Sequence, residues 1–303
     1  MSKRCGTGEI AELFPIVKES ILLFVLHKDL TKTVDRTDLR HIGGVDFASV
    51  PLKIMTSEKE YVDNAELSVS GMLSDLKAYK GRSHTSCPSI GEYMEAFEGC
   101  ENVFCITITS NLSGSFNAAK TAADGFLEAH PGVNIHVIDS LSTGPEMVLV
   151  IEKIVALAEA GLGFEEIKEQ ITDYNVNHTR LLFALESMHN LANNGRVSHI
   201  KAKMAGLLGI RAIGRASDVG TLEMICKSRG PKNTATDLYA NMKGDGYVGG
   251  KVRIHHAENP AIAESIKAEI LAEFPKAEII IDTAGGLCSF YAEAGGVLVG
   301  FEI

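Results

Sequence analysis

The spacing of apolar residues in the middle of the chain alternates between two periods. Short runs, the first of them rich in β-branched residues, are separated by longer segments in which apolar residues recur every three or four positions. The short runs predict strands at residues 103–109, 133–138 and 180–185. The longer segments predict helices at 115–130, 147–160 and 164–176. Because strands that alternate with helices form βαβ units, this half of the chain predicts a mainly parallel sheet flanked by helices.

The pattern changes after residue 185, where glycines divide the chain into shorter pieces. Strands are predicted at 210–214, 221–227, 252–256, 277–282 and 297–302. Helices are predicted at 231–243, opened by Pro231, and at 260–274. We therefore expect an α/β protein of two α/β domains, residues 1–178 and 179–303, the second built on a mixed sheet with helices. The sequence near the boundary is not rich in Ser, Gly or Pro, so the domains are expected to abut.

Length and charge restrict the class of protein. At 303 residues the chain is about twice the usual size of one domain. Its net charge of −10 argues against a nucleic-acid partner, because phosphate contacts need clustered basic residues. The longest apolar run near the N-terminus, residues 21–26, is too short for a transmembrane helix, which needs roughly 20 residues, or for a signal peptide. The sequence therefore predicts a cytoplasmic protein without stable membrane insertion.

The usual sequence signatures of catalysis and metal binding are missing. The six cysteines include no C-x-x-C pair, and six in this length do not make a disulfide scaffold. A G-x-G-x-x-G string at 244–249 follows a predicted helix and precedes a strand, the reverse of the dinucleotide-binding order. His255 and His256 are adjacent on a predicted strand, so they point to opposite faces and cannot share a metal ion. The sequence predicts no catalytic residue, no metal site and no cofactor.

A first candidate for ligand binding is the segment T-S-C-P-S at residues 85–89. Pro88 restrains Cys87 to an extended conformation. Ser89 and Glu92 have the spacing of a capping box, which predicts that a helix begins after Ser89. Thr85 and Ser86 are then expected in a loop that leads to a helix N-terminus, where unpaired N–H groups favour anions. An ordinary capped helix start is the alternative.

Two further candidates lie where predicted strands end and predicted helices begin. Residues 110–115 read S-N-L-S-G-S, and residues 139–145 read D-S-L-S-T-G-P. Open parallel sheets place ligands at such corners. Ser113, Ser115 and Ser140 offer hydroxyl groups, and Gly114 lets the backbone approach a ligand closely. Taken together, the two corners predict a cleft that binds a carboxylate or a phosphate.

These motifs together resemble those of the DegV family, bacterial fatty-acid-binding proteins that include the binding subunits of fatty acid kinase. Members typically carry T-S-Q-P-S, S-S-x-L-S-G-T-Y, I-D-S with a Ser/Gly-rich sequel, and G-G-R-I. This chain carries T-S-C-P-S at 85–89, T-S-N-L-S-G-S-F at 109–116, I-D-S at 138–140 and N-G-R-V at 194–197. Order and spacing agree over roughly residues 45–303, whereas the first 30 residues have no counterpart.

The resemblance implies two α/β domains with a long acyl chain in a tunnel between them. The implied ligand is a long-chain fatty acid such as palmitate, stearate or oleate, and no other cofactor is implied. Thr85 and Ser113 are expected to donate hydrogen bonds to the carboxylate. Ser86, Gly114 and Ser115 are expected to lie beside it.

The resemblance further implies a lipid carrier that is not itself an enzyme. Arg196 matches the family arginine, and together with Ser140 it is a candidate for contact with the head group or with a partner. That partner is a dihydroxyacetone-kinase-like fatty acid kinase subunit. The family commonly shows H-T-G-P-G near its C-terminus, but residues 283–288 contain no histidine. Binding and carriage without phosphorylation therefore stay open, as does a different class, an enzyme acting on a small carboxylate or phosphate substrate at the same corners.

Overall fold

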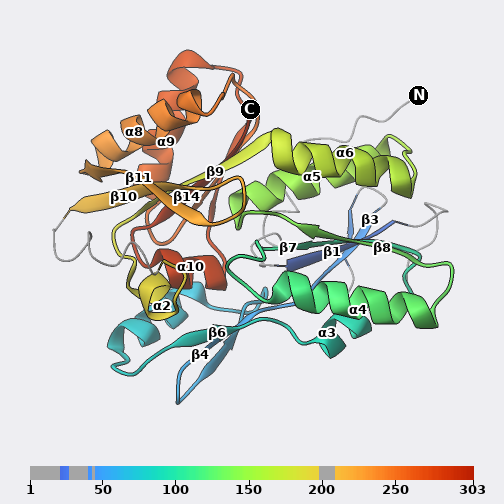
Figure 1. Cartoon of the computed structure of the whole chain (residues 1–303). Coiled ribbons are helices and arrows are strands. Elements are labelled where there is room, and N and C mark those ends of the chain that lie inside the picture. Colours follow the sequence, from blue (N-terminus) through green and yellow to red (C-terminus); the bar gives the residue numbers. More distant parts are fainter. Residues whose placement is uncertain (1–20, 27–39, 43–44, 198–208) are drawn as a thin grey trace.

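The computed structural model describes residues 21–26, 40–42, 45–197 and 209–303, and it arranges them in two main sheets with helices packed on both (Figure 1). The first sheet has the strand order β2-β3-β1-β7-β8. Its strands are β1 (Ile21–Leu26), β2 (Arg40–Ile42), β3 (Val45–Ser49), β7 (Asn102–Thr107) and β8 (Asn134–Asp139). Most of the N-terminal stretch without a family counterpart, residues 1–20, lies outside the described residues.

The predicted α/β class is confirmed, but the first sheet has less parallel pairing than predicted. β7 and β8 are parallel, as expected for a βαβ unit. β1 pairs antiparallel with both β7 and β3, and β2 pairs antiparallel with β3. The strands β1, β2 and β3 precede residues 103–185, the segment from which a parallel sheet was predicted. The periodicity of that segment therefore carried no information about how these three strands pair.

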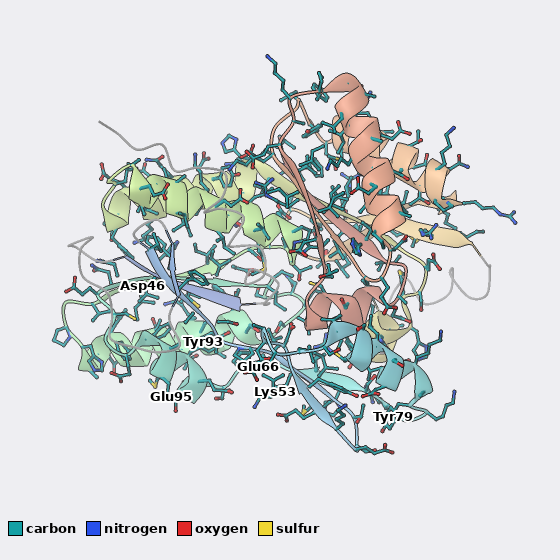
Figure 2. All side chains as sticks on the ribbon, turned by 180° about the vertical axis from the view of Figure 1, so that it is seen from behind. Asp46, Lys53, Glu66, Tyr79, Tyr93 and Glu95 are labelled. Carbon is teal, nitrogen blue, oxygen red and sulfur yellow. The ribbon has the colours of Figure 1, made fainter. Side chains whose placement is uncertain are left out.

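Two pairs of helices cover the two faces of the first sheet (Figure 1). On one side lie α3 (Ile90–Phe97) and α4 (Ser115–Ala129), and on the other lie α5 (Pro145–Glu159) and α6 (Phe164–Asn177). In the view from behind, Tyr93 of α3 lies between that helix and the sheet, where its ring is fully buried with Phe97 and Phe104 (Figure 2). The predicted capping box at Ser89 and Glu92 begins α3, since each residue hydrogen-bonds the backbone N–H of the other.

The second sheet has the strand order β11-β10-β9-β14-β12-β13 and is mixed, as predicted. Only β12 and β13 are parallel among its described pairs. Its strands are β9 (Thr179–Leu185), β10 (Ile210–Ala216), β11 (Leu222–Arg229), β12 (Val252–His256), β13 (Ile279–Thr283) and β14 (Val297–Glu302). Helices α8 (Pro231–Gly244) and α9 (Pro260–Glu273) cover one face of this sheet (Figure 1).

A third, small sheet and three short helices were not predicted. The sheet has the order β5-β4-β6, with β4 at Lys53–Met55, β5 at Glu60–Val62 and β6 at His84–Ser86. The helices are α2 (Val69–Ala78), α7 (His189–Asn193) and α10 (Gly286–Ala292). The predicted loop around Thr85 is therefore wrong in one respect, because Thr85 and Ser86 pair with β4 as part of a strand. Such pairing depends on residues some 30 positions away and leaves no local pattern.

Helix α10 packs against the small sheet although it follows β13 in the chain. Phe290 is fully buried in one cluster with Ile54, Tyr61 and Met72. Lys53, on β4, lies next to α3 (Figure 2), with its Nζ atom 3.6 Å from Glu92 Oε1. The small sheet thus connects elements from both ends of the chain. The predicted boundary near residue 178 falls between α6 and β9, and the division into two domains there stays a prediction.

Candidate ligand-binding site

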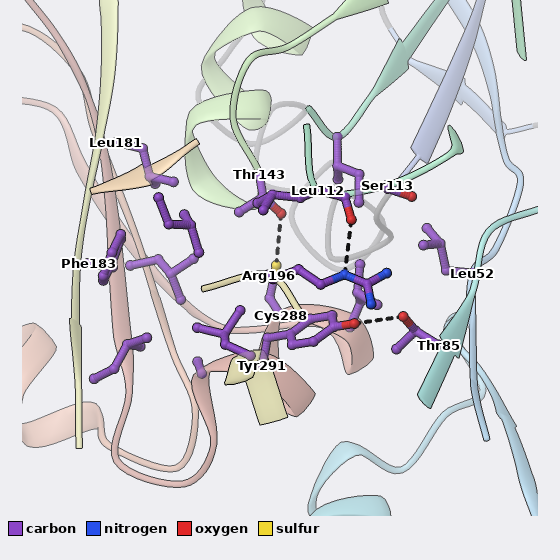
Figure 3. Close-up of a pocket in the computed structure, with 17 residues that line it drawn as sticks. Leu52, Thr85, Leu112, Ser113, Thr143, Leu181, Phe183, Arg196, Cys288 and Tyr291 are labelled. Carbon is purple, nitrogen blue, oxygen red and sulfur yellow. Dashed lines mark hydrogen bonds between the residues drawn. The ribbon is translucent and has the colours of Figure 1, made fainter. Parts of the chain in front are cut away.

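A pocket lies where the loops of the first sheet meet β9, β14 and α10 (Figure 3). Including the part open to solvent, its empty space amounts to about 680 Å³. Seventeen residues line it. The apolar ones are Leu52, Ile108, Leu112, Leu181, Phe183, Leu185, Leu191, Leu222, Leu287, Ala292 and Leu298. The others are Thr85, Ser113, Thr143, Arg196, Cys288 and Tyr291.

The apolar wall of the pocket comes largely from one face of β9. Because side chains alternate along a strand, Leu181, Phe183 and Leu185 all point to the pocket side. The intervening Leu182 and Ala184 point to the opposite face, where they pack in the core under α8 and α9. The continuous apolar pattern of this strand thus serves two purposes, a core on one face and a pocket wall on the other.

Helix α10 supplies a second wall through its helical spacing. Leu287 and Tyr291 are four residues apart and so lie on one face of the helix, as do Cys288 and Ala292. The start of the helix is held by Asp63, whose two carboxylate oxygens accept hydrogen bonds from the N–H groups of Gly286 and Leu287 at 2.6 and 2.9 Å. A carboxylate at this position satisfies N–H groups that no helical carbonyl can reach.

The polar groups of the pocket gather at one end, opposite the wall formed by Leu181 and Phe183 (Figure 3). The hydroxyls of Thr85 and Tyr291 are 2.7 Å apart. The Arg196 guanidinium lies over the Tyr291 ring, 5.7 Å from its centroid. Its Nε and Nη1 atoms donate to the carbonyl oxygens of Leu112 and Asn194 at 3.2 and 2.6 Å.

Ser113 joins this polar end from the loop that opens α4. Its hydroxyl lies 2.8 Å from that of Ser115, and it accepts a hydrogen bond from the Ser115 N–H at 3.3 Å. Ser115 is fully buried, whereas Ser113 is half-buried and lines the pocket. The pair therefore points one hydroxyl toward the pocket and keeps the other behind it.

The last corner of the first sheet reaches the pocket through Thr143. Gly144 adopts a positive φ of 58°, which favours glycine, and a side chain there would press on Cys288, with its Cβ 3.2 Å from Sγ. The turn brings Thr143 Oγ1 to 3.5 Å from Cys288 Sγ. Burial raises the pKa of Cys288 to about 11, so its thiol is neutral near pH 7.

The charge at the polar end is positive. Within the described part of the chain, no carboxylate forms an ion pair with Arg196, and the seventeen lining residues include no Asp or Glu. Burial raises the pKa of Tyr291, so its phenol stays protonated and can donate a hydrogen bond. One guanidinium and several neutral hydroxyls at one end of an apolar pocket favour an anion with a long apolar tail.

The sequence-predicted residues divide into two groups. Thr85, Ser113 and Arg196 line the pocket together, although they come from distant parts of the chain. The other four are not among its lining residues, namely Ser86, Gly114, Ser115 and Ser140. Ser140 is buried and holds its own turn, since its hydroxyl donates to the Ser142 carbonyl and accepts from the Ser142 N–H, both at 3.1 Å. The Ser86 hydroxyl donates to the Cys87 carbonyl at 3.1 Å.

Several lining residues were missed by the sequence analysis. Tyr291, Cys288 and Thr143 are the polar ones. Thr143 lies in the corner at residues 139–145, which the sequence analysis names as a candidate, so the sequence did contain a signal for this residue. Nothing comparable marked Tyr291, because α10 is only seven residues long and Asp63, which holds its start, lies more than 220 residues earlier in the chain.

The described residues contain neither a cluster suited to a metal ion nor a helix suited to span a membrane. No group of three or more His, Cys, Asp or Glu side chains there could hold a metal ion. No helix in the same residues is both long and apolar enough to cross a bilayer.

Comparison with known proteins decides the family. A family model described as an uncharacterised protein of the DegV family matches residues 37–302. The chain belongs to the DegV family. A curated DegV domain-containing protein of Streptococcus pneumoniae, spr0652, is 44% identical over 257 residues, which are 85% of this chain and 91% of that protein. The resemblance inferred from the motifs is thereby confirmed.

Two solved structures similar to this chain were determined with a fatty acid loaded. One is a DegV family protein from Eubacterium eligens loaded with heptadecanoic acid, at 44% identity and a TM-score of 0.81, over 84% of this chain and 92% of that one. The other is the Streptococcus pneumoniae fatty acid kinase (Fak) B3 protein loaded with linoleic acid. It is 44% identical with a TM-score of 0.82, over 84% of this chain and 91% of that one.

Proposed function

We propose that this DegV-family protein binds a long-chain fatty acid, such as palmitate, stearate or oleate, in the pocket described above. The observation that carries the proposal is the separation of polar and apolar lining. Arg196, Thr85 and Ser113 lie at one end, and apolar side chains, most of them leucines, form the greater part of the rest. The two relatives at 44% identity, which carry heptadecanoic and linoleic acid, support the same ligand class.

The energetics favour such a ligand. Each methylene group that leaves water contributes about 0.8 kcal/mol, so a tail of many carbons supplies most of the affinity. Protein groups have to donate hydrogen bonds to the carboxylate, because burying an unpaired charge is costly. We assign that role to the hydroxyls of Thr85 and Ser113 and to the Arg196 guanidinium, which together offer charge-assisted hydrogen bonds.

We further propose that the protein is a carrier in the cytoplasm and does no chemistry on its ligand. The alternative is an enzyme that acts on a small carboxylate or phosphate substrate at the same corners. A small anionic substrate would leave most of the apolar wall formed by β9, β14 and α10 uncovered. The Cys288 thiol, with its pKa raised to about 11, is poorly suited to act as a nucleophile.

The decisive experiment measures head-group recognition. Wild type and the Thr85→Ala/Ser113→Ala variant are titrated with palmitate and with methyl palmitate, which keeps the tail and lacks the charge. Losing two charge-assisted hydrogen bonds should weaken palmitate binding by about 100-fold or more, since each contributes roughly 1.5–3 kcal/mol. Methyl palmitate should be affected far less.

A matched control removes two hydroxyls that lie on exposed helix surfaces, in Thr121→Ala/Ser265→Ala. This variant should bind palmitate like wild type. Purified wild-type protein should also release a fatty acid on denaturation and solvent extraction, detected by mass spectrometry. Unchanged palmitate affinity in Thr85→Ala/Ser113→Ala would place the carboxylate elsewhere, and the absence of any bound or added fatty acid would contradict the carrier function.

We also propose that the carrier presents its ligand to a dihydroxyacetone-kinase-like fatty acid kinase subunit. The support is the 44% identity to a protein named as fatty acid kinase B3. In the proposed reaction the carboxylate oxygen attacks the γ-phosphorus of ATP, giving acyl phosphate and ADP. Reconstitution with a candidate kinase subunit, ATP and palmitate should therefore yield acyl phosphate only when the carrier is present. Production of acyl phosphate at the same rate without the carrier would contradict this role.

A further inference from the structure

Tyr291 lies at the polar end of the pocket but is not one of the groups assigned to the carboxylate. Its hydroxyl is 2.7 Å from Thr85 Oγ1, and the two residues come from α10 and β6, which are 206 positions apart. Both side chains are half-buried and line the pocket. The contact therefore depends on the tertiary fold and lies next to the proposed head-group position (Figure 3).

The direction of this hydrogen bond determines what Thr85 can offer to a ligand. A threonine hydroxyl has a single proton to donate and two lone pairs. If Thr85 donated to Tyr291, its proton would be used and only lone pairs would face the ligand. If Tyr291 donates, the Thr85 proton is free to point at an anion. A phenol is the more acidic of the two hydroxyls, so donation from Tyr291 to Thr85 is the favoured direction when a carboxylate is bound.

The ring of Tyr291 has a second contact at the same end. The Arg196 guanidinium carbon lies 5.7 Å from the ring centroid, within the range of a cation–π interaction. Two backbone carbonyls fix the guanidinium from other sides. One side chain therefore touches both a proposed hydrogen-bond donor and the positive charge of the pocket.

The position of Tyr291 is itself fixed. Its neighbour Phe290 is fully buried among Ile54, Tyr61 and Met72, and the start of the helix is held by Asp63. The Phe290 and Tyr291 rings pack edge to face, with centroids 4.8 Å apart. The phenol therefore has little freedom to move away from Thr85.

The other proposed donor has the same arrangement. Ser113 lies in the pocket, and the buried Ser115 hydroxyl stands 2.8 Å behind it. A donation from Ser115 to Ser113 likewise leaves the Ser113 proton for the ligand. Each of the two proposed hydroxyl donors is thus paired with a second hydroxyl.

We propose that Tyr291 is a positioning residue for the head group, which donates to Thr85 so that the Thr85 proton points at the carboxylate, and which supports Arg196 with its ring. The proposal rests on the proposed function, because it assumes that a carboxylate occupies this end of the pocket. It assigns to α10 a part in recognising the charge of the ligand, in addition to lining the apolar part.

The test is Tyr291→Phe, which removes the phenolic oxygen and keeps the ring under Arg196. Palmitate binding should weaken by about tenfold, as for one charge-assisted hydrogen bond. Binding of methyl palmitate should change much less, since a neutral ester gains little from the orientation of Thr85. In a Thr85→Ala background, Tyr291→Phe should have almost no further effect on palmitate, because the residue through which it acts is gone.

Tyr247→Phe serves as the matched control, since it removes a buried phenol that donates to the Gly250 carbonyl and does not line the pocket. It should leave the affinity for palmitate unchanged. Equal losses for palmitate and methyl palmitate in Tyr291→Phe, or full additivity with Thr85→Ala, would overturn the positioning role. That result differs from failure of the proposed function, in which Thr85→Ala/Ser113→Ala would itself bind palmitate like wild type.

Discussion

At the scale of single residues, Glu146 is a buried carboxyl group three residues after Thr143, which lines the pocket. It lies in the first turn of α5, is 5% exposed, and accepts a hydrogen bond from Thr179 Oγ1 at 2.8 Å. Burial raises the pKa of Glu146 from 4.5 to about 7, against the opposing effects of the hydrogen bond from Thr179 and the charge of Arg180. The cost of ionising this group falls on the folded state alone.

The raised pKa makes stability depend on pH in a defined direction. Between pH 4.5 and 7 the folded state keeps a proton on Glu146 that the unfolded state has lost, so the free energy of unfolding falls as pH rises through this window. The full effect of a shift of this size is about 3 kcal/mol, reached above pH 7. The group contributes no such loss below pH 4.5, where both states are protonated.

We therefore predict that Glu146→Gln removes this component of the pH dependence. Urea unfolding of wild type and variant at pH 5 and pH 8 gives four free energies. The difference between variant and wild type should move in favour of the variant by a few kcal/mol on going from pH 5 to pH 8. Other titrating groups cancel in that difference, so parallel pH profiles for the two proteins would show that Glu146 is ionised without penalty.

At the scale of secondary structure, the sequence was most informative where an element is long or fully buried. Strands β12 and β14 were predicted at their observed bounds, and β14 is an almost continuous apolar run that ends at Glu302. Helices α4, α5 and α6 were predicted within one or two residues at each end, because their apolar spacing extends over three or more turns. The capped start of α3 was predicted from two residues alone.

Short elements show why the rest could not be predicted. β4, β5 and β6 have three residues each, too few for a period to be recognised, and they are held by pairing with one another. α10 begins where Asp63 caps it from a distant loop. The residues of the candidate site differ in the same way. Thr85, Ser113 and Arg196 could be named from the sequence because they lie in recognisable motifs. Tyr291 reaches the site only through the fold.

At the scale of the whole molecule, α5 links the two main sheets. It covers the first sheet and packs against β9, β12 and β14 of the second (Figure 1). Gly300 on β14 permits this approach, because a side chain there would collide with the backbone of Pro145 and Glu146. Since the pocket is lined by loops that follow strands of the first sheet and by strands of the second, its shape depends on how firmly α5 holds the two sheets together.

A buried ion pair fastens this junction. Arg253 of β12 is fully buried and binds Glu152 of α5 through two hydrogen bonds of 2.7 Å, from Nε and Nη2 to the two carboxylate oxygens. Lys251 lies 3.1 Å from the same carboxylate, and Glu278 lies 2.5 Å from Arg253. Removing Arg253 takes away both 2.7 Å hydrogen bonds to the buried Glu152 carboxylate and leaves it with Lys251, and breaking a buried pair typically costs 3–5 kcal/mol.

We predict that Arg253→Met lowers the free energy of unfolding by about 3–5 kcal/mol, measured by urea denaturation at pH 7. Arg253→Met/Glu152→Met should recover much of the loss, because no charge is then left buried without a partner and the apolar side chains fill similar space. Lys59→Met, which breaks the exposed pair with Asp75, should cost no more than about 1 kcal/mol. A double variant as unstable as Arg253→Met would mean that the pair itself, and not the avoidance of a lone buried charge, stabilises the contact between α5 and the second sheet.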